Sequence, residues 1–128
     1  MTRNEKKLAA NQLGRLAEKM AAQEYIKQGF TVLERQWRMG KTEIDLIMQK
    51  DDLVVLAEVK ARQTTEEDAM SAVTRDKRKR MVKAADLYLQ RLPGNCSYRF
   101  DIVACSGKEE KDLRISIHED AFLAADLF

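Results

Sequence analysis

The chain has 128 residues, enough for one ordinary folded domain but too few for two independent hydrophobic cores. Hydrophobic residues make up 45% and charged residues 34%, a balance that favours a folded domain over a disordered chain. The formal net charge is only +2, from 23 Lys and Arg against 21 Asp and Glu, so any surface that attracts a polyanion must be local.

The first half of the chain predicts one helix followed by three strands. Apolar residues recur at three- and four-residue steps over residues 8–28, which is typical of an amphipathic helix, and Gly29 is its expected C-terminal cap. Residues 30–38 and 42–49 alternate or mix β-branched residues with polar ones, so they predict two strands joined by a turn. Residues 53–60 open with a continuous apolar run, which indicates a third strand that is central and covered on both faces.

The second half predicts another helix and two more strands. Residues 73–91 have helical periodicity, and Pro93-Gly94 ends them. Residues 99–105 predict a fourth strand, residues 113–118 a short fifth strand, and residues 119–127 one or two closing helical turns. This order predicts an α/β domain with an αβββαβ core, in which helices flank a mixed central sheet.

Several other classes of protein are disfavoured. Cys96 and Cys105 form no CxxC pair and have no accompanying His cluster, so we expect reduced thiols rather than a zinc site or a disulfide framework. The first seven residues lack the apolar segment of a signal peptide, and no stretch approaches the roughly 18 apolar residues of a membrane span. We therefore expect a single cytoplasmic domain over residues 1–128, with no membrane partner.

Two charged residues at the end of the third predicted strand need partners. Glu58 and Lys60 are two positions apart and should project from the same face of the strand. Buried charges are costly unless they are paired or coordinated. Asp45 lies within an apolar stretch of the neighbouring predicted strand, and the short hairpin between the two strands can bring it beside Glu58. The sequence therefore predicts two converging carboxylates with a lysine beside them.

These groups suit a magnesium ion, with Mn²⁺ as an alternative. Mg²⁺ prefers oxygen ligands and keeps several waters, so Asp45, Glu58 and the backbone carbonyl of Val59 are a sufficient protein contribution. Such an ion activates water and stabilises charge on a phosphoryl oxygen, while Lys60 orients the attacking water or neutralises the phosphate. The competing interpretation is a structural ion-pair cluster at the end of the sheet.

The same residues resemble the signature of the PD-(D/E)XK nuclease superfamily. Asp45 followed by Glu58-Val59-Lys60 is similar to that motif, with Ile44 where the superfamily name has proline. The wider sequence from residue 14 to residue 103 resembles the bacterial YraN-like family. The segments that carry this resemblance are Gly14-Arg15-Leu16-Ala17-Glu18, Gly29-Phe30-Thr31-Val32-Leu33-Glu34-Arg35, Trp37-Arg38, Glu43-Ile44-Asp45-Leu46-Ile47, Glu58-Val59-Lys60-Ala61-Arg62, Lys77 and Arg99-Phe100-Asp101.

The resemblance implies both a fold and a class of partner. The YraN-like family is similar in fold to archaeal Holliday-junction resolvases, which implies a restriction-endonuclease-like αβββαβ core that acts on nucleic acid, with DNA as the expected substrate. Resolvases of similar fold work as pairs, so a homodimer is also implied. Glu18 matches a helical glutamate that completes the family's metal site, although Ala17 stands where the family usually has glycine. Without the resemblance, Glu18 would be interpreted as a solvated helix residue.

Cations near the predicted site are candidate contacts for a nucleic-acid backbone. Arg62 continues the strand face of Lys60 and either binds a phosphate or forms a surface salt bridge. Residues 75–80 place several cations on the expected exposed side of the second helix. We predict phosphate contacts for Lys77, which matches a family position, and for Arg78, while the other cations keep the helix soluble.

Three further features allow a functional role, a structural role or both. Arg38 beside Trp37 could clamp a nucleotide, although a half-buried core position is favoured for the tryptophan. Glu43 shares a strand face with Asp45 and is either a further ligand or a solvent-facing residue. Arg99-Phe100-Asp101 puts Arg99 and the following aspartate on one strand face, where we expect the pair to brace the sheet.

Two functions follow from these predictions. The first is a Mg²⁺-dependent endonuclease that hydrolyses phosphodiester bonds in branched or single-stranded DNA. The second is a non-catalytic nucleic-acid-binding module derived from a nuclease fold, because a site can keep its geometry after losing catalysis. Nucleotide hydrolysis of the P-loop type is disfavoured, since the sequence has no glycine-rich phosphate-binding loop.

Overall fold

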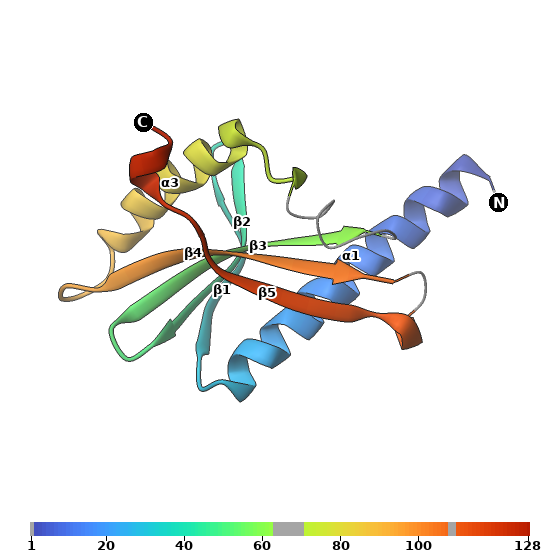
Figure 1. The fold of residues 1–128 in the computed structure, drawn as a ribbon, viewed down its shortest axis with the longest axis horizontal. Coiled ribbons are helices and arrows are strands. Elements are labelled where there is room, and N and C mark those ends of the chain that lie inside the picture. The colour runs from blue at the N-terminus through green and yellow to red at the C-terminus, as the bar shows by residue number, and fades with distance from the viewer. Residues whose placement is uncertain (1, 63–70, 108–109) are drawn as a thin grey trace.

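One five-stranded mixed sheet organises the chain, with strands in the order β1-β2-β3-β4-β5 (Figure 1). The computed structural model describes residues 2–62, 71–107 and 110–128, and of residues 4–9 and 62 it describes the backbone alone. The elements are α1 (Arg3–Lys27), β1 (Thr31–Met39), β2 (Thr42–Lys50), β3 (Leu53–Arg62), α3 (Arg75–Leu89), β4 (Ser97–Ser106), the 3-10 turn η1 (Glu110–Asp112), β5 (Arg114–Phe122) and the 3-10 turn η2 (Ala124–Asp126).

Strands β3 and β4 are parallel, and every other neighbouring pair is antiparallel. Hairpins connect the antiparallel strands β1, β2 and β3, whereas α3 lies in the crossover that a parallel pair requires. The expected α/β class, the αβββαβ order and the restriction-endonuclease-like core are therefore confirmed. The central place expected for β3 is also confirmed, because it lies between β2 and β4.

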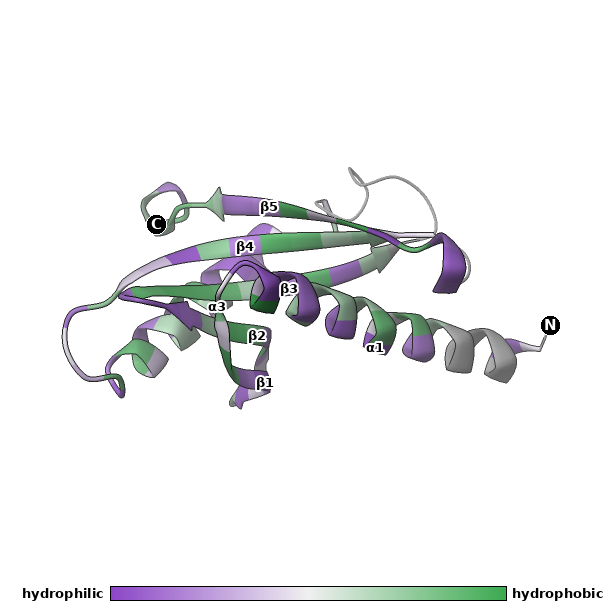
Figure 2. Ribbon diagram, turned by 90° about the horizontal axis from the view of Figure 1, so that it is seen from below, coloured by the Kyte–Doolittle hydropathy of each residue, from purple (hydrophilic) through white to green (hydrophobic). Residues whose placement is uncertain are grey.

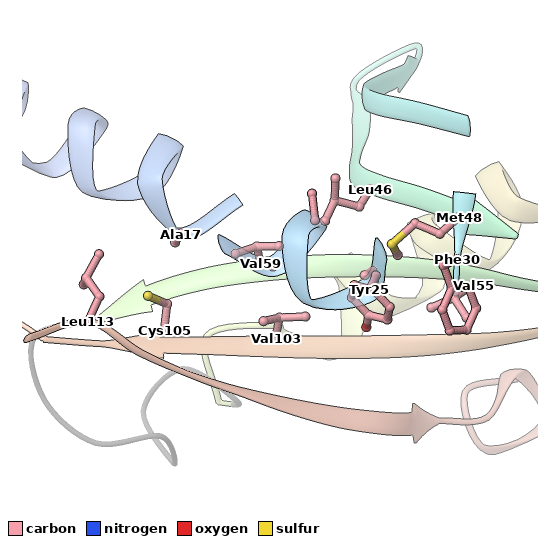
Figure 3. Packing of buried hydrophobic residues seen from close by; sticks show 13 residues of the cluster. Ala17, Tyr25, Phe30, Leu46, Met48, Val55, Val59, Val103, Cys105 and Leu113 are labelled. Carbon is pink, nitrogen blue, oxygen red and sulfur yellow. The ribbon is translucent and has the colours of Figure 1, made fainter. Parts of the chain in front are cut away.

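Two hydrophobic clusters fill the two sides of the sheet, because side chains alternate along each strand. The first lies under α1, and Figure 3 shows part of it: Ala17, Tyr25, Phe30, Leu46, Met48, Val55, Val59, Val103, Cys105 and Leu113. The second lies under α3: Ile44, Ile47, Val54, Leu56, Met81, Ala84, Ala85, Tyr88, Phe100 and Ile102. Figure 2 shows apolar colour along the inner strands and alternating polar and apolar stretches on α1.

Strand β2 leaves β3 before β3 ends. The antiparallel ladder between them stops at Leu46 opposite Ala57, whereas the parallel ladder of β3 with β4 continues to Arg62. The alternation of β2 also breaks here, because Ile44 packs in the α3 cluster beside Ile47 although Leu46 faces α1. Figure 3 shows β2 changing direction near Leu46. The last part of β3 is therefore without a β2 backbone ladder.

The end of the chain differs from the prediction. Strand β5 extends to Phe122, so residues 119–122 are strand rather than the predicted closing helix, and only η2 is helical. The reason is tertiary: β4 offers an edge whose backbone groups need partners, and β5 supplies them as far as Phe122 opposite Phe100. These two rings stack with centroids 4.8 Å apart. Asp120, at φ 52°, lies within an irregularity of this ladder.

Other differences are shifts of element boundaries. Helix α1 begins at Arg3 rather than at residue 8, and α3 is slightly shorter than residues 73–91. The polar segment 63–68 falls outside the described residues. Both cysteines are free thiols, as expected. Within the described part of the chain, no helix combines the length and the apolar character that crossing a membrane requires.

Candidate active site

Two buried carboxylates meet where β2 and β3 separate. Asp45 on β2 is 7% exposed and Glu58 on β3 is 4% exposed. The Oδ2 atom of Asp45 accepts a hydrogen bond of 2.8 Å from the backbone N–H of Val59. The aspartate side chain thus satisfies a β3 donor beyond the point where the backbone ladder has ended. The departure of β2 is what makes room for both acids.

Two lysines approach Glu58 from different elements. Lys60 Nζ lies 3.9 Å from Glu58 Oε1, so the two residues share a strand face as predicted. Lys77 Nζ, on α3, lies 3.3 Å from Glu58 Oε2 and donates a hydrogen bond of 2.8 Å to the backbone carbonyl of Glu43. Thr74 caps α3 by accepting the Lys77 N–H at 3.2 Å. Lys77 therefore bridges β2 and β3 where their ladder is missing.

The environment of Glu58 favours its protonated form. Burial raises the pKa of Glu58 to about 8, together with hydrogen bonding to Asp45 and the like charge of Asp45, while Lys77 and Lys60 lower it. Its Oε2 atom is buried and, among the described residues, has no hydrogen-bond partner. The ammonium of Lys77 is within ion-pair distance of that oxygen but outside hydrogen-bond geometry. One buried acceptor oxygen is therefore left unsatisfied, which proteins usually avoid.

Glu18 extends the acidic cluster from α1. It accepts a hydrogen bond of 3.1 Å from Gln36 Nε2. Burial raises the pKa of Glu18, as do the charge of Asp45 and hydrogen bonding with Asp45. Asp45 is consequently the common neighbour of Glu18 and Glu58. In the described part of the chain, however, no three His, Cys, Asp or Glu side chains stand in an arrangement that could hold a metal ion.

The donor groups nevertheless fit a hard divalent cation. Asp45 and Glu58 present carboxylate oxygens, and Glu58 Oε2 has no hydrogen-bond donor among the described residues. Mg²⁺ needs few protein ligands because it keeps several waters, so this pair is sufficient and Glu18 could add to it. The backbone N–H of Val59 already serves Asp45, and the role of the Val59 carbonyl stays a prediction.

The predicted exposure of the α3 cations is wrong for Lys77 and Arg78. Both are half-buried, because the start of α3 packs against β2 and against the C-terminal segment. The Nε–H of Arg78 donates to the Val73 carbonyl at 2.9 Å, and its guanidinium lies 5.2 Å from the centre of the Phe122 ring. Their contact with phosphate stays a prediction, but both side chains already have partners within the chain.

The other residues considered for contact with nucleic acid differ in their exposure and in their partners. Arg38 is 76% exposed at its side chain and pairs with Glu43 at 3.1 Å. Trp37 is half-buried and packs edge-on against Tyr88, with ring centroids 5.1 Å apart, as the core interpretation expected. The side chain of Arg62 lies outside the described residues.

Gln36 is the contact that sequence reasoning missed. Its amide holds Glu18, and its backbone has φ 50°, a left-handed conformation that is uncommon for a residue with a side chain. A glutamine within an alternating strand segment carries no signal for either property. Only the approach of α1 to β1 brings it to the acidic cluster.

The fold and this acidic and lysine-bearing centre define a restriction-endonuclease-like domain of the PD-(D/E)XK class. The family model described as "Uncharacterised protein family UPF0102" matches residues 17–105, and the chain belongs to this family. This confirms the expected membership of the YraN-like group.

Three UPF0102 proteins illustrate the relationship. The one from Flavobacterium psychrophilum is 35% identical over 113 residues, covering 88% of this chain and 94% of that protein. The one from Brucella canis is 44% identical over 102 residues, covering 78% and 80%. The one from Chloroherpeton thalassium is 37% identical over 118 residues, covering 90% and 92%.

Among solved structures, Pyrococcus furiosus SfsA in complex with Ca²⁺ is similar at a TM-score of 0.33 and 11% identity. The match covers 89% of this chain and 63% of that one.

Proposed function

We propose that this protein is a Mg²⁺-dependent endonuclease that hydrolyses phosphodiester bonds in DNA, with Mn²⁺ as an alternative cofactor. The observation that supports this most is the buried pair of Asp45 and Glu58, in which Glu58 Oε2 has no hydrogen-bond partner among the described residues. A purely structural ion-pair cluster would be expected to satisfy its buried oxygens. A buried pair of acids with an oxygen that lacks a hydrogen bond suits a cation site.

The chain's own residues divide the work. Asp45 and Glu58 would hold the metal, with the Val59 carbonyl and Glu18 as further oxygen donors. When bound, Mg²⁺ supplies positive charge to the phosphoryl group and acidity to water. Lys60 lies on the half-exposed side of the pair, where it can orient a water or neutralise a phosphate oxygen.

Lys77 has a different task from Lys60. Its hydrogen bond to the Glu43 carbonyl fixes its ammonium against Glu58 from the α3 side. It therefore keeps β2 and β3 at the separation that the two acids need.

DNA as the substrate, and branched or single-stranded DNA in particular, comes from the resemblance to resolvases.

The test is a cleavage assay with the purified full chain. Labelled single-stranded, duplex, flap and four-way-junction DNA would be incubated with Mg²⁺ or Mn²⁺. Asp45→Ala and Lys60→Ala should each lower the cleavage rate by about a hundredfold or more. Lys83→Ala is the matched control, since Lys83 is an exposed lysine of α3, and it should cut like the parent. Equal rates for Lys60→Ala and the parent would refute the assignment.

A second candidate is a nucleic-acid-binding module that no longer cuts. It is favoured by the absence of three ready metal ligands among the described residues. It predicts salt-sensitive DNA binding without cleavage, and binding that survives Glu58→Gln because this change adds no negative charge. Metal-dependent cleavage that Asp45→Ala abolishes would dismiss it.

A further inference from the structure

An open groove lies between α1 and β1, next to the acidic cluster. Its volume is about 460 Å³, within the range of roughly 300–1,000 Å³ that is common for ligand sites. Four of its six lining residues are polar. The lining is formed by Ala10, Asn11, Gly14, Arg15, Glu18 and Gln36. Glu18 lines the groove and also belongs to the acidic cluster, so the groove leads to Asp45.

Gly14 has no structural explanation within the described chain. Glycine is disfavoured in a helix interior, and Gly14 is well inside α1. A Cβ atom added there would meet no heavy atom within 4 Å, so packing does not demand glycine. Its φ is also not positive. Because glycine has no side chain, it exposes the helix backbone in the groove, and another molecule can approach that backbone closely.

The polar residues of the groove can bind an anionic, hydroxyl-bearing chain. Arg15 is exposed and forms no ion pair with any residue that the structure describes. Gln36 is held at φ 50° with one amide N–H on Glu18, and that amide has a second N–H to donate. A guanidinium beside amide donors matches phosphate and sugar oxygens, which receive most protein contacts in nucleic-acid complexes.

We propose that this groove binds the sugar–phosphate backbone of the nucleic-acid strand beside the bond to be cut. Arg15 and Glu18 are three residues apart on α1 and so lie on the same face of the helix. A strand whose phosphate rests on Arg15 is thereby directed past Glu18 toward Asp45 and Glu58. That the bound strand is also cut rests on the proposed nuclease function, but binding in the groove is testable without cleavage.

The test is fluorescence anisotropy with a short labelled DNA strand and its duplex, in EDTA so that nothing is cut. Gly14→Leu fills the groove, while Gln12→Leu adds the same side chain at an exposed α1 position outside it. Arg15→Gln removes the groove cation, and Lys19→Gln removes an exposed α1 cation elsewhere. The groove variants should bind at least about fivefold more weakly, and Arg15→Gln should lower the salt slope by about 0.7–0.9.

The outcomes separate the groove from the nuclease proposal. If Gly14→Leu and Arg15→Gln bind no worse than Gln12→Leu and Lys19→Gln, the groove assignment is wrong, whatever the cleavage assay shows. A parent that binds neither DNA probe at low salt also overturns it. If the two groove variants lose binding but the parent cuts no DNA, the groove stands and the nuclease proposal fails. Circular dichroism of Gly14→Leu and Gly14→Ala checks that α1 is intact.

Discussion

At the scale of single residues, Glu58 dominates the electrostatics of the site. It combines almost complete burial with a carboxylate neighbour, and among the described residues Lys60 and Lys77 partly compensate its charge. Its carboxyl group therefore binds a proton more tightly in the folded protein than in the unfolded chain. That difference links proton binding to the stability of the metal-free fold.

We predict that the metal-free protein loses stability as the pH rises. The pKa of Glu58 is raised from 4.5 to about 8, so its contribution is fully present below about pH 4.5 and is lost as the pH passes through 8. Urea unfolding in EDTA across this window measures the effect. Glu58→Gln should flatten the pH dependence, whereas Glu110→Gln, at an exposed glutamate, should not. An unchanged pH profile for Glu58→Gln would contradict the assignment.

Asp101 forms the second buried charged centre, and it braces the fold as expected. It is fully buried and accepts hydrogen bonds from Tyr25 Oη at 2.7 Å, from Arg99 Nε at 3.0 Å and from the Asp120 N–H at 3.0 Å. These contacts tie α1 and β5 to the inner strand β4. Burial and the neighbouring Asp101 charge also raise the pKa of Tyr25.

Replacing the tyrosine should cost stability without disturbing the acidic pair. Tyr25→Phe removes one hydrogen bond to a buried carboxylate, and we expect a loss of about 1–3 kcal/mol in the free energy of unfolding. Tyr98→Phe is the control, because Tyr98 is 48% exposed, and should change stability by less than about 0.5 kcal/mol. Denaturant unfolding decides between them. Similar losses for both variants would argue against the buried network.

At the scale of elements, the start of α3 joins the site to the end of the chain. Lys77 points to Glu58, while Arg75 donates to the backbone carbonyls of Asp126 and Leu127. Arg78 lies over Phe122. One turn of helix therefore positions a site lysine and anchors the C-terminal segment. The cationic run is in part a structural clamp rather than a free polyanion surface.

Arg78→Ala should therefore act on stability. We expect a loss of about 1–2 kcal/mol, from the hydrogen bond to Val73 and the contact with the Phe122 ring. Arg80→Ala removes an exposed cation of the same helix and should stay within about 0.5 kcal/mol of the parent. Thermal unfolding compares the two variants. Equal stability of both would show that Arg78 does not clamp the C-terminal segment.

At the scale of the whole molecule, a cation bound at Asp45 and Glu58 would link two strands that have lost their ladder. We predict that Mg²⁺ at a hundred times its dissociation constant raises the free energy of unfolding by about 2.7 kcal/mol. Asp45→Asn should remove this stabilisation. Potassium chloride at matched ionic strength controls for screening. An equal Mg²⁺ effect in the parent and in Asp45→Asn would show that the metal does not bind at Asp45.

The convergence of Asp45, Glu58 and Lys60 was predictable because it follows from local rules. A strand period of two puts Glu58 and Lys60 on one face of β3. The short hairpin between β2 and β3 then places Asp45 on the strand next to them. The position of Lys77 was not predictable in this way. Its direction depends on how α3 packs against β2, which no periodicity within residues 75–80 reports.

The order of elements from α1 to β5, the faces of β3 and the acidic pair follow from the sequence, because hydrophobic periodicity and turn residues act over a few positions. The tertiary structure alone decided where β2 leaves β3, how Gln36 reaches Glu18 and that residues 119–122 extend β5. Each of these depends on backbone groups and side chains that are distant in the chain and must satisfy one another. Long-range pairing of that kind overrides local propensity.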